Sequence, residues 1–163
     1  DRDCTFDGTV VSTFVDTATH DGGFSVVLFE QVWTGTMYCA TDTSAYEFAD
    51  TVYLRSTDTQ FLAYESLWSD TAMVFLQEPI QEGETWNPFP GEGGAIATVT
   101  NTNKTVITPA GTFTGCVEVL ITALRDTQYR LEMVFAESVG LAKLSELSEE
   151  GSRVDILRSY TIP

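Results

Sequence analysis

The chain has 163 residues, the length of one ordinary domain; 43% of them are hydrophobic and 20% are charged. Eight Lys and Arg residues stand against 24 Asp and Glu residues, which gives a net charge of −16 at pH 7. This balance excludes nucleic-acid and anionic-lipid surfaces as main partners, because both need basic patches. No apolar run is long enough for a membrane helix. We expect a single folded domain covering residues 1–163, without membrane insertion.

Hydrophobic residues recur with period two along almost the whole chain, which is typical of β-strands. In chain order, the predicted strands cover residues 24–33, 46–55, 61–68, 72–76, 94–100, 104–108, 112–122, 129–135 and 154–162. The many Thr, Val, Phe and Tyr residues suit a pleated, half-buried surface. We therefore predict an all-β fold, a single-domain antiparallel β-sandwich or half-open barrel of about ten strands.

Two connections in the second half have turn chemistry. The spacer Asn101-Thr102-Asn103 predicts a hairpin turn, because Asn tolerates the left-handed backbone of a tight turn. Pro109 and Gly111 predict a second turn, in which Pro109 pre-sets φ and Gly111 supplies a positive φ.

The segment 141–147 is ambiguous between strand and helix. Leu141, Leu144 and Leu147 fit a helical spacing, and Gly151 is placed as a stop. A short helix is therefore an alternative to a strand in this segment.

The start of the chain and its cysteines bear on cellular location. The sequence begins at Asp1 without Met, as removal of a secretion signal leaves it, although trimming gives the same start. We expect an extracytoplasmic protein: secreted, on the cell surface or periplasmic. Three cysteines allow one disulfide and a free thiol; we favour Cys4–Cys39, near predicted strand ends, which stabilises by roughly 3–4 kcal/mol. Cys116 is expected to be a small buried hydrophobe.

Three segments share their order and spacing with one family: Glu78–Trp86, Val106–Val119 and Phe135–Lys143. They resemble the Pro-Leu-x-x-Gly-Asp-x-Trp, Thr-Pro-Ala-Gly-Thr-Phe-x-Asn-Cys and Tyr-Ala-Pro-Gly-Val-Gly-Leu-Val-Lys segments of uncharacterised bacterial extracytoplasmic β-rich domains, often lipoproteins. The resemblance covers about residues 75–163, with Glu137-Ser138 where the family has Pro-Gly. It implies a β fold and a cell-envelope location without a known catalytic motif, and it favours a strand at 141–147.

The sequence contains few candidates for catalysis. The one histidine, His20, lies in the predicted turn 19–23, where we expect it to be exposed, and no Gly-x-Ser-x-Gly elbow is present. A carboxylate pair for glycoside cleavage is possible among 24 acidic residues, but spacing singles out none. We therefore predict a non-enzymatic protein, with a glycosidase-like hydrolase as the third hypothesis.

Two binding or modification sites follow from residue type. Calcium prefers oxygen ligands, which Asp16 and Asp21 with nearby loop carbonyls provide, or Asp1 and Asp3 near Asp42. No other cofactor is expected. Asn103 begins a glycosylation sequon, placed at the tip of the predicted hairpin.

The leading functional hypothesis is a structural subunit of a surface filament or envelope complex. Its partner is a second copy or another envelope protein, joined by strand addition at a sheet edge. The segment 5–15 is a plausible donated strand, whose assembly residues are Phe6, Val10, Val11 and Phe14.

The alternative hypothesis is a monomeric binding module for an apolar ligand or a cationic partner. Its pocket is formed by the aromatic residues Trp33, Phe61, Tyr64 and Trp68, which simple core packing also explains. Trp86 is expected in the core.

Overall fold

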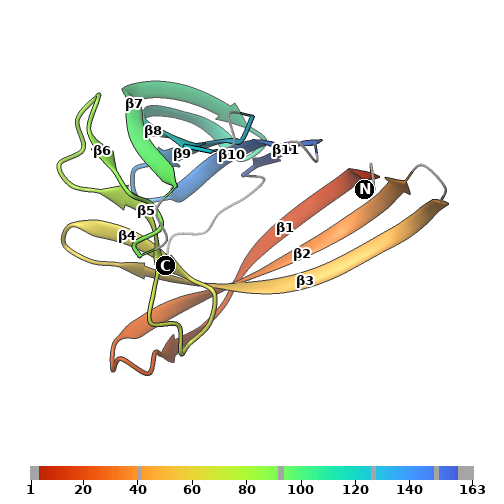
Figure 1. The fold of residues 1–163 in the computed structure, drawn as a ribbon, viewed down its shortest axis with the longest axis horizontal. Coiled ribbons are helices and arrows are strands. Elements are labelled where there is room, and N and C mark those ends of the chain that lie inside the picture. Colours follow the sequence, from red (N-terminus) through yellow and green to blue (C-terminus); the bar gives the residue numbers. More distant parts are fainter. Residues whose placement is uncertain (1–3, 40–41, 92–93, 126–127, 149–150, 158–163) are drawn as a thin grey trace. The chain divides into compact units, whose positions relative to one another are not determined.

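The computed structural model describes residues 4–39, 42–91, 94–125, 128–148 and 151–157; at some strand positions, only the backbone is described (Figure 1). These residues form eleven strands and no helix, in two antiparallel sheets, which confirms the predicted all-β class. The chain divides into two compact units, Asp1–Phe75 and Leu76–Pro163. The single domain and the sandwich or half-open barrel stay predictions.

The first unit contains a five-stranded sheet in the order β1-β2-β3-β4-β5. The strands are β1 Cys4–Thr19, β2 Ser25–Cys39, β3 Asp42–Ser56, β4 Gln60–Tyr64 and β5 Met73–Gln77. β4 is short, and of the residues of β3 it pairs with Tyr53–Ser56 alone. The first three strands therefore continue beyond β4 as a three-stranded ribbon, which we call the β1–β3 ribbon (Figure 1).

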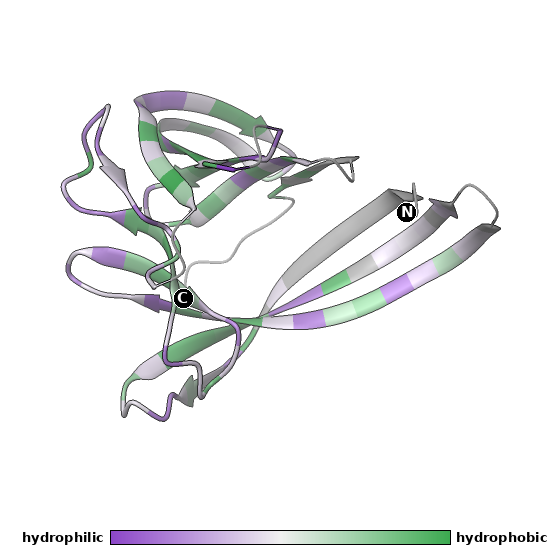
Figure 2. Cartoon of the chain, in the orientation of Figure 1, coloured by the Kyte–Doolittle hydropathy of each residue, from purple (hydrophilic) through white to green (hydrophobic). Residues whose placement is uncertain are grey.

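Buried side chains gather where β4 joins the sheet. Val26, Leu62, Ala63, Tyr64 and Val74 are buried there. Along the ribbon, by contrast, the described side chains of β3 from residue 43 to 50 are exposed, except for the half-buried Tyr46. Apolar and polar residues follow each other along this strand (Figure 2). These described side chains of β3 therefore contribute little to a core.

The second unit contains a six-stranded sheet in which each strand pairs with its neighbours in the chain. The strands are β6 Thr85–Trp86, β7 Ala95–Thr108, β8 Gly111–Ala123, β9 Arg130–Ala136, β10 Gly140–Ser148 and β11 Gly151–Ile156. Alternate residues of β7, Ala95, Ala97 and Val99, are buried, which is the period-two pattern of a half-buried strand. Trp86 is buried, as expected.

The predicted hairpin turn at Asn101–Asn103 is wrong, because β7 runs through it as an irregular strand. Its register with β8 shifts between Val99 and Val106. Side chains provide the acceptors that such a bulge needs: the Asn103 N–H donates to Asn101 Oδ1 at 2.7 Å, and the Thr102 N–H donates to Glu82 Oε1 at 3.1 Å. With these N–H groups satisfied, the chain continues in the same direction.

The segment 141–147 lies within β10, so the helical alternative is wrong. Pairing with β9 on one side and β11 on the other satisfies its backbone, which leucine spacing alone does not reveal. The predicted turn at Pro109–Gly111 is confirmed, because Thr108 pairs with Gly111 and Gly111 has a φ of 142°.

Candidate functional site

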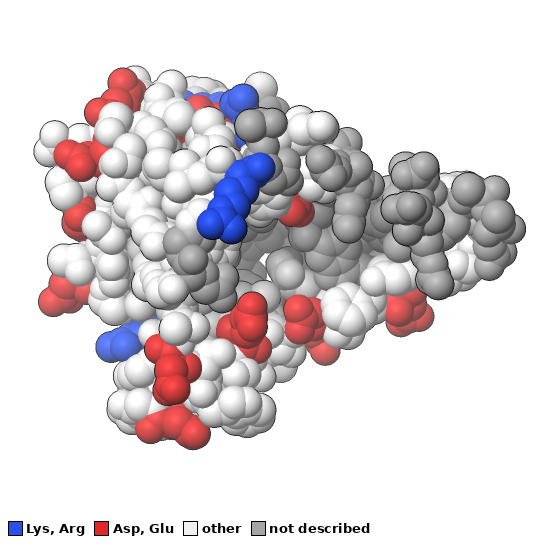
Figure 3. Space-filling view, in the orientation of Figure 1, with Lys and Arg blue, Asp and Glu red and all other residues white. Residues whose placement is uncertain are grey.

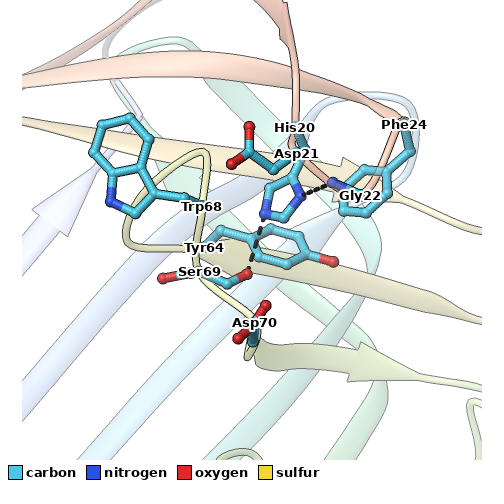
Figure 4. Close-up of a pocket in the computed structure, with 8 residues that line it drawn as sticks. All are labelled: His20, Asp21, Gly22, Phe24, Tyr64, Trp68, Ser69 and Asp70. Carbon is cyan, nitrogen blue, oxygen red and sulfur yellow. Dashed lines mark hydrogen bonds between the residues drawn. The ribbon is translucent and has the colours of Figure 1, made fainter.

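An open cavity of about 360 Å³ lies on the first unit, between the β1–β2 turn and the β4–β5 connection (Figure 4). Its lining residues are His20, Asp21, Gly22 and Phe24 from the turn, and Tyr64, Trp68, Ser69 and Asp70 from β4 and the connection. The lining residues of the two segments are at least forty positions apart in the chain. The cavity is therefore a product of tertiary structure.

Hydrogen bonds hold the turn and the connection together. The Asp21 N–H donates to the carbonyl of Leu67 at 3.0 Å, and His20 Nε2 lies 3.1 Å from the carbonyl oxygen of Ser69. The His20 N–H donates to the Phe24 carbonyl at 2.9 Å and closes the turn itself. The walls of the cavity are thus fixed by backbone groups on both sides.

His20 is buried, with 6% of its surface exposed, which corrects the expectation of an exposed turn histidine. The Gly22 N–H donates to His20 Nδ1 at 3.0 Å, so Nδ1 is the acceptor and Nε2 carries the hydrogen donated to Ser69. Both nitrogens of the imidazole are therefore engaged by backbone groups. Ser69 meets it with a carbonyl and not with its hydroxyl, so the pair lacks the contact of a nucleophile and its base.

Aromatic rings form the floor of the cavity. The rings of His20 and Phe24 stack with centroids 4.4 Å apart, and Tyr64 tilts against both, at 4.8 and 5.6 Å. The Arg55 guanidinium carbon lies 3.8 Å from the Phe24 centroid. Two groups so close to one ring cannot share a face, so His20 and Arg55 cover opposite faces of Phe24. Cation–π attraction stabilises this stack.

The opening of the cavity is lined by an exposed indole and two carboxylates. Trp68 is 72% exposed, and Asp21 and Asp70 are exposed as well. In Figure 4, Asp21 and Trp68 lie on one side of Tyr64, and Asp70 lies on the other side, next to Ser69. Among the described residues that line the cavity there is no Lys or Arg. The site therefore combines π-faces with negative charge.

The structure brings together two of the four aromatic residues predicted for a pocket. Tyr64 and Trp68 line the cavity, whereas Phe61 packs against Phe75, with ring centroids 6.1 Å apart. The side chain of Trp33 lies outside the described residues. Sequence reasoning missed His20 and Phe24 as lining residues, although the glycines between them indicated a tight turn.

The predicted assembly segment belongs to the chain's own sheet. The backbones of Phe6, Val10, Val11 and Phe14 pair with Met37, Trp33, Val32 and Phe29 of β2, respectively. The side chains of the four assembly residues lie outside the described residues. Since β1 is the end strand of its sheet, its second edge has no strand partner in the described part of the chain.

β3 also has an edge without a described strand partner. The Thr51 N–H donates to Asp50 Oδ1 at 2.8 Å, so it points away from β2. Because backbone groups alternate sides along a strand, those of Ala45, Glu47 and Ala49 point the same way as Thr51. β4 reaches only to Tyr53. The ribbon thus presents a row of outward backbone groups along β3.

The strand register places Cys4 directly opposite Cys39. Since the Thr51 N–H points away from β2, the backbone N–H and C=O of the preceding residue, Asp50, point toward its partner Gln31 in β2. Cys39 lies an even number of residues after Gln31, so its backbone N–H and C=O also point toward β3. Cys4 and Cys39 are then a non-hydrogen-bonded pair, whose Cα atoms lie about 4.5 Å apart. That separation suits a disulfide. The two side chains lie outside the described residues, so the bond stays a prediction.

The other predicted sites are dispersed. Asp16 Oδ1 accepts a hydrogen bond from the Thr17 N–H at 2.7 Å, while Asp21 lines the cavity. Among the described residues, no group of three or more His, Cys, Asp and Glu is placed to hold a metal ion. The alternative calcium ligands Asp1 and Asp3, with the side chain of Asp42, lie outside the described residues. Calcium binding stays a prediction.

The sequon residue Asn103 is exposed, but it lies in the irregular part of β7 and not at a hairpin tip. The next residue, Lys104, forms ion pairs with Glu118 and with Glu132, the latter at 3.3 Å. The side chain of Asn103 is accessible to solvent. Its glycosylation stays a prediction.

Two groups of the second unit have perturbed acidity. Cys116 is fully buried among Val106, Val134 and Ala142, as expected, and burial raises its pKa. Burial also raises the pKa of Tyr129, with a further contribution from the negative charge of Glu146. Both shifts favour the neutral form, which makes Cys116 a structural side chain and not a reactive thiol.

No protein-family model, curated protein or solved structure matches this chain. Within the described ranges, no helix has the length and apolar character needed to cross a membrane. The resemblance of residues 75–163 to extracytoplasmic domains therefore stays a prediction, as does the extracytoplasmic location.

Proposed function

We propose that this chain is a non-enzymatic, extracytoplasmic structural subunit that assembles through the edges of its β1–β3 ribbon. The observation that supports this most is the outward edge of β3, where Ala45, Glu47 and Ala49 present backbone groups beyond the end of β4. An exposed edge of this length is a template for another strand. The outer edge of β1 in a second copy offers the backbone N–H and C=O groups that could pair with this edge of β3.

The geometry of these edges favours open-ended growth. The outer edges of β1 and β3 lie on opposite sides of the same ribbon. Pairing β1 of one copy with β3 of the next is a head-to-tail contact, which extends into a filament or closes into a ring. The partner is thus another copy of this chain.

Charge opposes the assembly at low salt. Residues 1–75 contain 12 acidic side chains against Arg2 and Arg55, and acidic side chains are prominent on the face in Figure 3. Like charges on adjoining copies repel each other, and salt screens this repulsion over about 10 Å at 0.1 M and about 3 Å at 1 M. Assembly should therefore increase with ionic strength.

Extracytoplasmic location is the second half of the proposal. It is supported by the register that sets Cys4 opposite Cys39, because disulfides persist in oxidising compartments. The resemblance of residues 75–163 to envelope domains points the same way.

The test blocks the β3 edge without touching the β2 ladder. Ala45→Pro/Ala49→Pro removes two outward N–H donors at positions where an edge strand tolerates proline. The matched control, Ala45→Thr/Ala49→Thr, keeps both donors. Negative-stain microscopy and sedimentation at rising concentration, at low salt and about 1 M salt, should show assemblies of the wild type and the Thr variant only. Circular dichroism checks that all three proteins fold.

Dispersed wild-type particles under every condition would overturn the assembly hypothesis. They would favour the second candidate, a monomeric binding module. The aromatic cavity between the β1–β2 turn and the β4–β5 connection is the observation that supports this candidate.

A further inference from the structure

We propose that the cavity of His20, Phe24, Tyr64 and Trp68 binds the alkylammonium group of a small organic cation. This inference deepens the second candidate function and does not depend on assembly. It names the chemical class of the ligand, which an aromatic pocket by itself leaves open between apolar and cationic molecules.

The aromatic cluster already holds one cation of this chain. The guanidinium of Arg55 sits over Phe24 at 3.8 Å, on the face away from His20. On the cavity side, the exposed indole of Trp68 offers the ring with the strongest cation–π attraction. Tyr64 contributes a second ring to the lining. Aromatic walls of this kind suit weakly hydrated ammonium groups.

The hydrogen bonds of His20 fix its ring as a wall of the cavity. Nδ1 accepts from the Gly22 N–H, and Nε2 lies 3.1 Å from the Ser69 carbonyl oxygen. The turn that builds the cavity therefore also holds the ring of His20 in place as a third aromatic wall.

Two carboxylates in the lining favour a positively charged ligand. Asp21 and Asp70 both line the cavity, and the described lining contains no basic side chain. The excess of acidic residues in the first unit adds a long-range attraction for cations. An anionic ligand is disfavoured by all of these charges, and a neutral apolar ligand gains nothing from them.

The size of the cavity indicates one small ligand group. About 360 Å³ is near the lower end of the range for small-molecule sites. It accommodates a trimethylammonium or aminomethyl head, while the open side allows the rest of the molecule to extend into solvent.

Choline is the first probe, and its neutral isostere 3,3-dimethyl-1-butanol is the matched control ligand. Calorimetry and NMR of the Trp68 indole N–H, assigned by its loss in Trp68→Ala, measure binding to the full chain. We expect choline to bind at least about tenfold more tightly than the isostere, because only choline gains cation–π and carboxylate attraction. Nα-acetyl-lysine amide, which keeps the side-chain ammonium, is the second probe. If it binds more tightly than choline, the natural ligand group is a lysine side chain; if it binds more weakly, the natural ligand group is a free quaternary ammonium.

Variants locate the site. Trp68→Ala and Asp21→Asn/Asp70→Asn should each weaken choline binding about tenfold or more, whereas Asp58→Asn, an exposed acid of the same unit outside the cavity, should not. Equal binding of the isostere, binding unaffected by these variants, or no binding at all would overturn the proposal. Ala45→Pro/Ala49→Pro should leave choline binding unchanged, and Trp68→Ala should leave assembly unchanged, so the two proposals fail separately.

Discussion

Ser138 adopts a φ of 62° in the turn between β9 and β10, the only described non-glycine residue with a positive φ. This left-handed conformation costs an L-residue about 1–2 kcal/mol. The backbone of this turn thus requires what a glycine provides, and the serine occupies it under strain.

Replacing Ser138 with glycine should stabilise the protein. Relief of the left-handed strain outweighs the extra entropy of an unfolded glycine, which leaves a gain of about 0.5–1 kcal/mol. Denaturant unfolding measures it. The neighbouring exposed variant Glu137→Gly is the control and should destabilise slightly, because that residue has no positive φ to relieve. Equal effects of the two variants would show that the turn is not strained.

The raised pKa values of Cys116 and Tyr129 predict a loss of stability in alkali. Both groups hold their protons more tightly in the folded state than in the unfolded one. The contribution of each group to the free energy of unfolding is complete below its ordinary pKa, which is 9.0 for Cys116 and 10.0 for Tyr129. Each contribution is lost as the pH rises towards the higher pKa of that group in the folded state.

Thermal unfolding at rising pH tests this expectation. The unfolding temperature of the wild type should fall above about pH 9, and the fall should be smaller in Cys116→Ala/Tyr129→Phe, which has neither titrating group. The same slope in both proteins would exclude these two residues as its cause.

Among the strands, the pairing of β1 with β2 places Cys4 directly opposite Cys39 at the end of the ribbon away from the β1–β2 turn. These strands extend into a ribbon in which the described side chains of β3 from residue 43 to 50 are mostly exposed, so these side chains contribute little to a hydrophobic core. A cross-strand disulfide stabilises by roughly 3–4 kcal/mol on the chain-entropy model. It would replace, in this ribbon, the stabilisation that a core supplies elsewhere.

Counting thiols tests the disulfide directly. In denaturant without a reductant, the purified protein should react with one equivalent of a thiol reagent through Cys116 alone, and with three equivalents after reduction. The folded protein should not react, because Cys116 is buried. Three reactive thiols before reduction would show that Cys4 and Cys39 are unpaired.

At the scale of the whole molecule, acidic charge is the property shared by both proposals. The first unit contains 12 acidic residues and only two basic ones, and Arg55 is engaged with Phe24. This charge attracts an organic cation to the cavity but repels a second copy from the ribbon edge. Rising salt therefore acts in opposite directions: it should promote assembly and weaken choline binding.

The two units differ in how they are stabilised. In the second unit, alternate residues of β7 and β8 bury a continuous apolar face that includes Val99, Val119 and Ile121. In the first, burial is concentrated where β4 joins the sheet, and the ribbon has open edges. The long ribbon and the open cavity both belong to the first unit.

The sequence was sufficient to predict the fold class, because a strand that buries one face must alternate apolar and polar residues, as Tyr129–Met133 does. It also determined the turn at Pro109–Gly111 and the burial of Cys116. These features depend on a residue's own chemistry and on its nearest neighbours.

Tertiary structure decided where local preferences competed with distant partners. Asn101–Asn103 favours a turn locally, but Glu82 supplies an acceptor for the Thr102 N–H, and β7 continues through this segment as an irregular strand. Leu141–Leu147 has helical spacing, but strands on both sides satisfy its backbone. His20 belongs to a turn that looks exposed, yet the Ser69 carbonyl, 49 positions away, buries it and builds the cavity. Hydrogen-bond partners far along the chain leave no pattern in the segment that they bind, so only the folded structure reveals them.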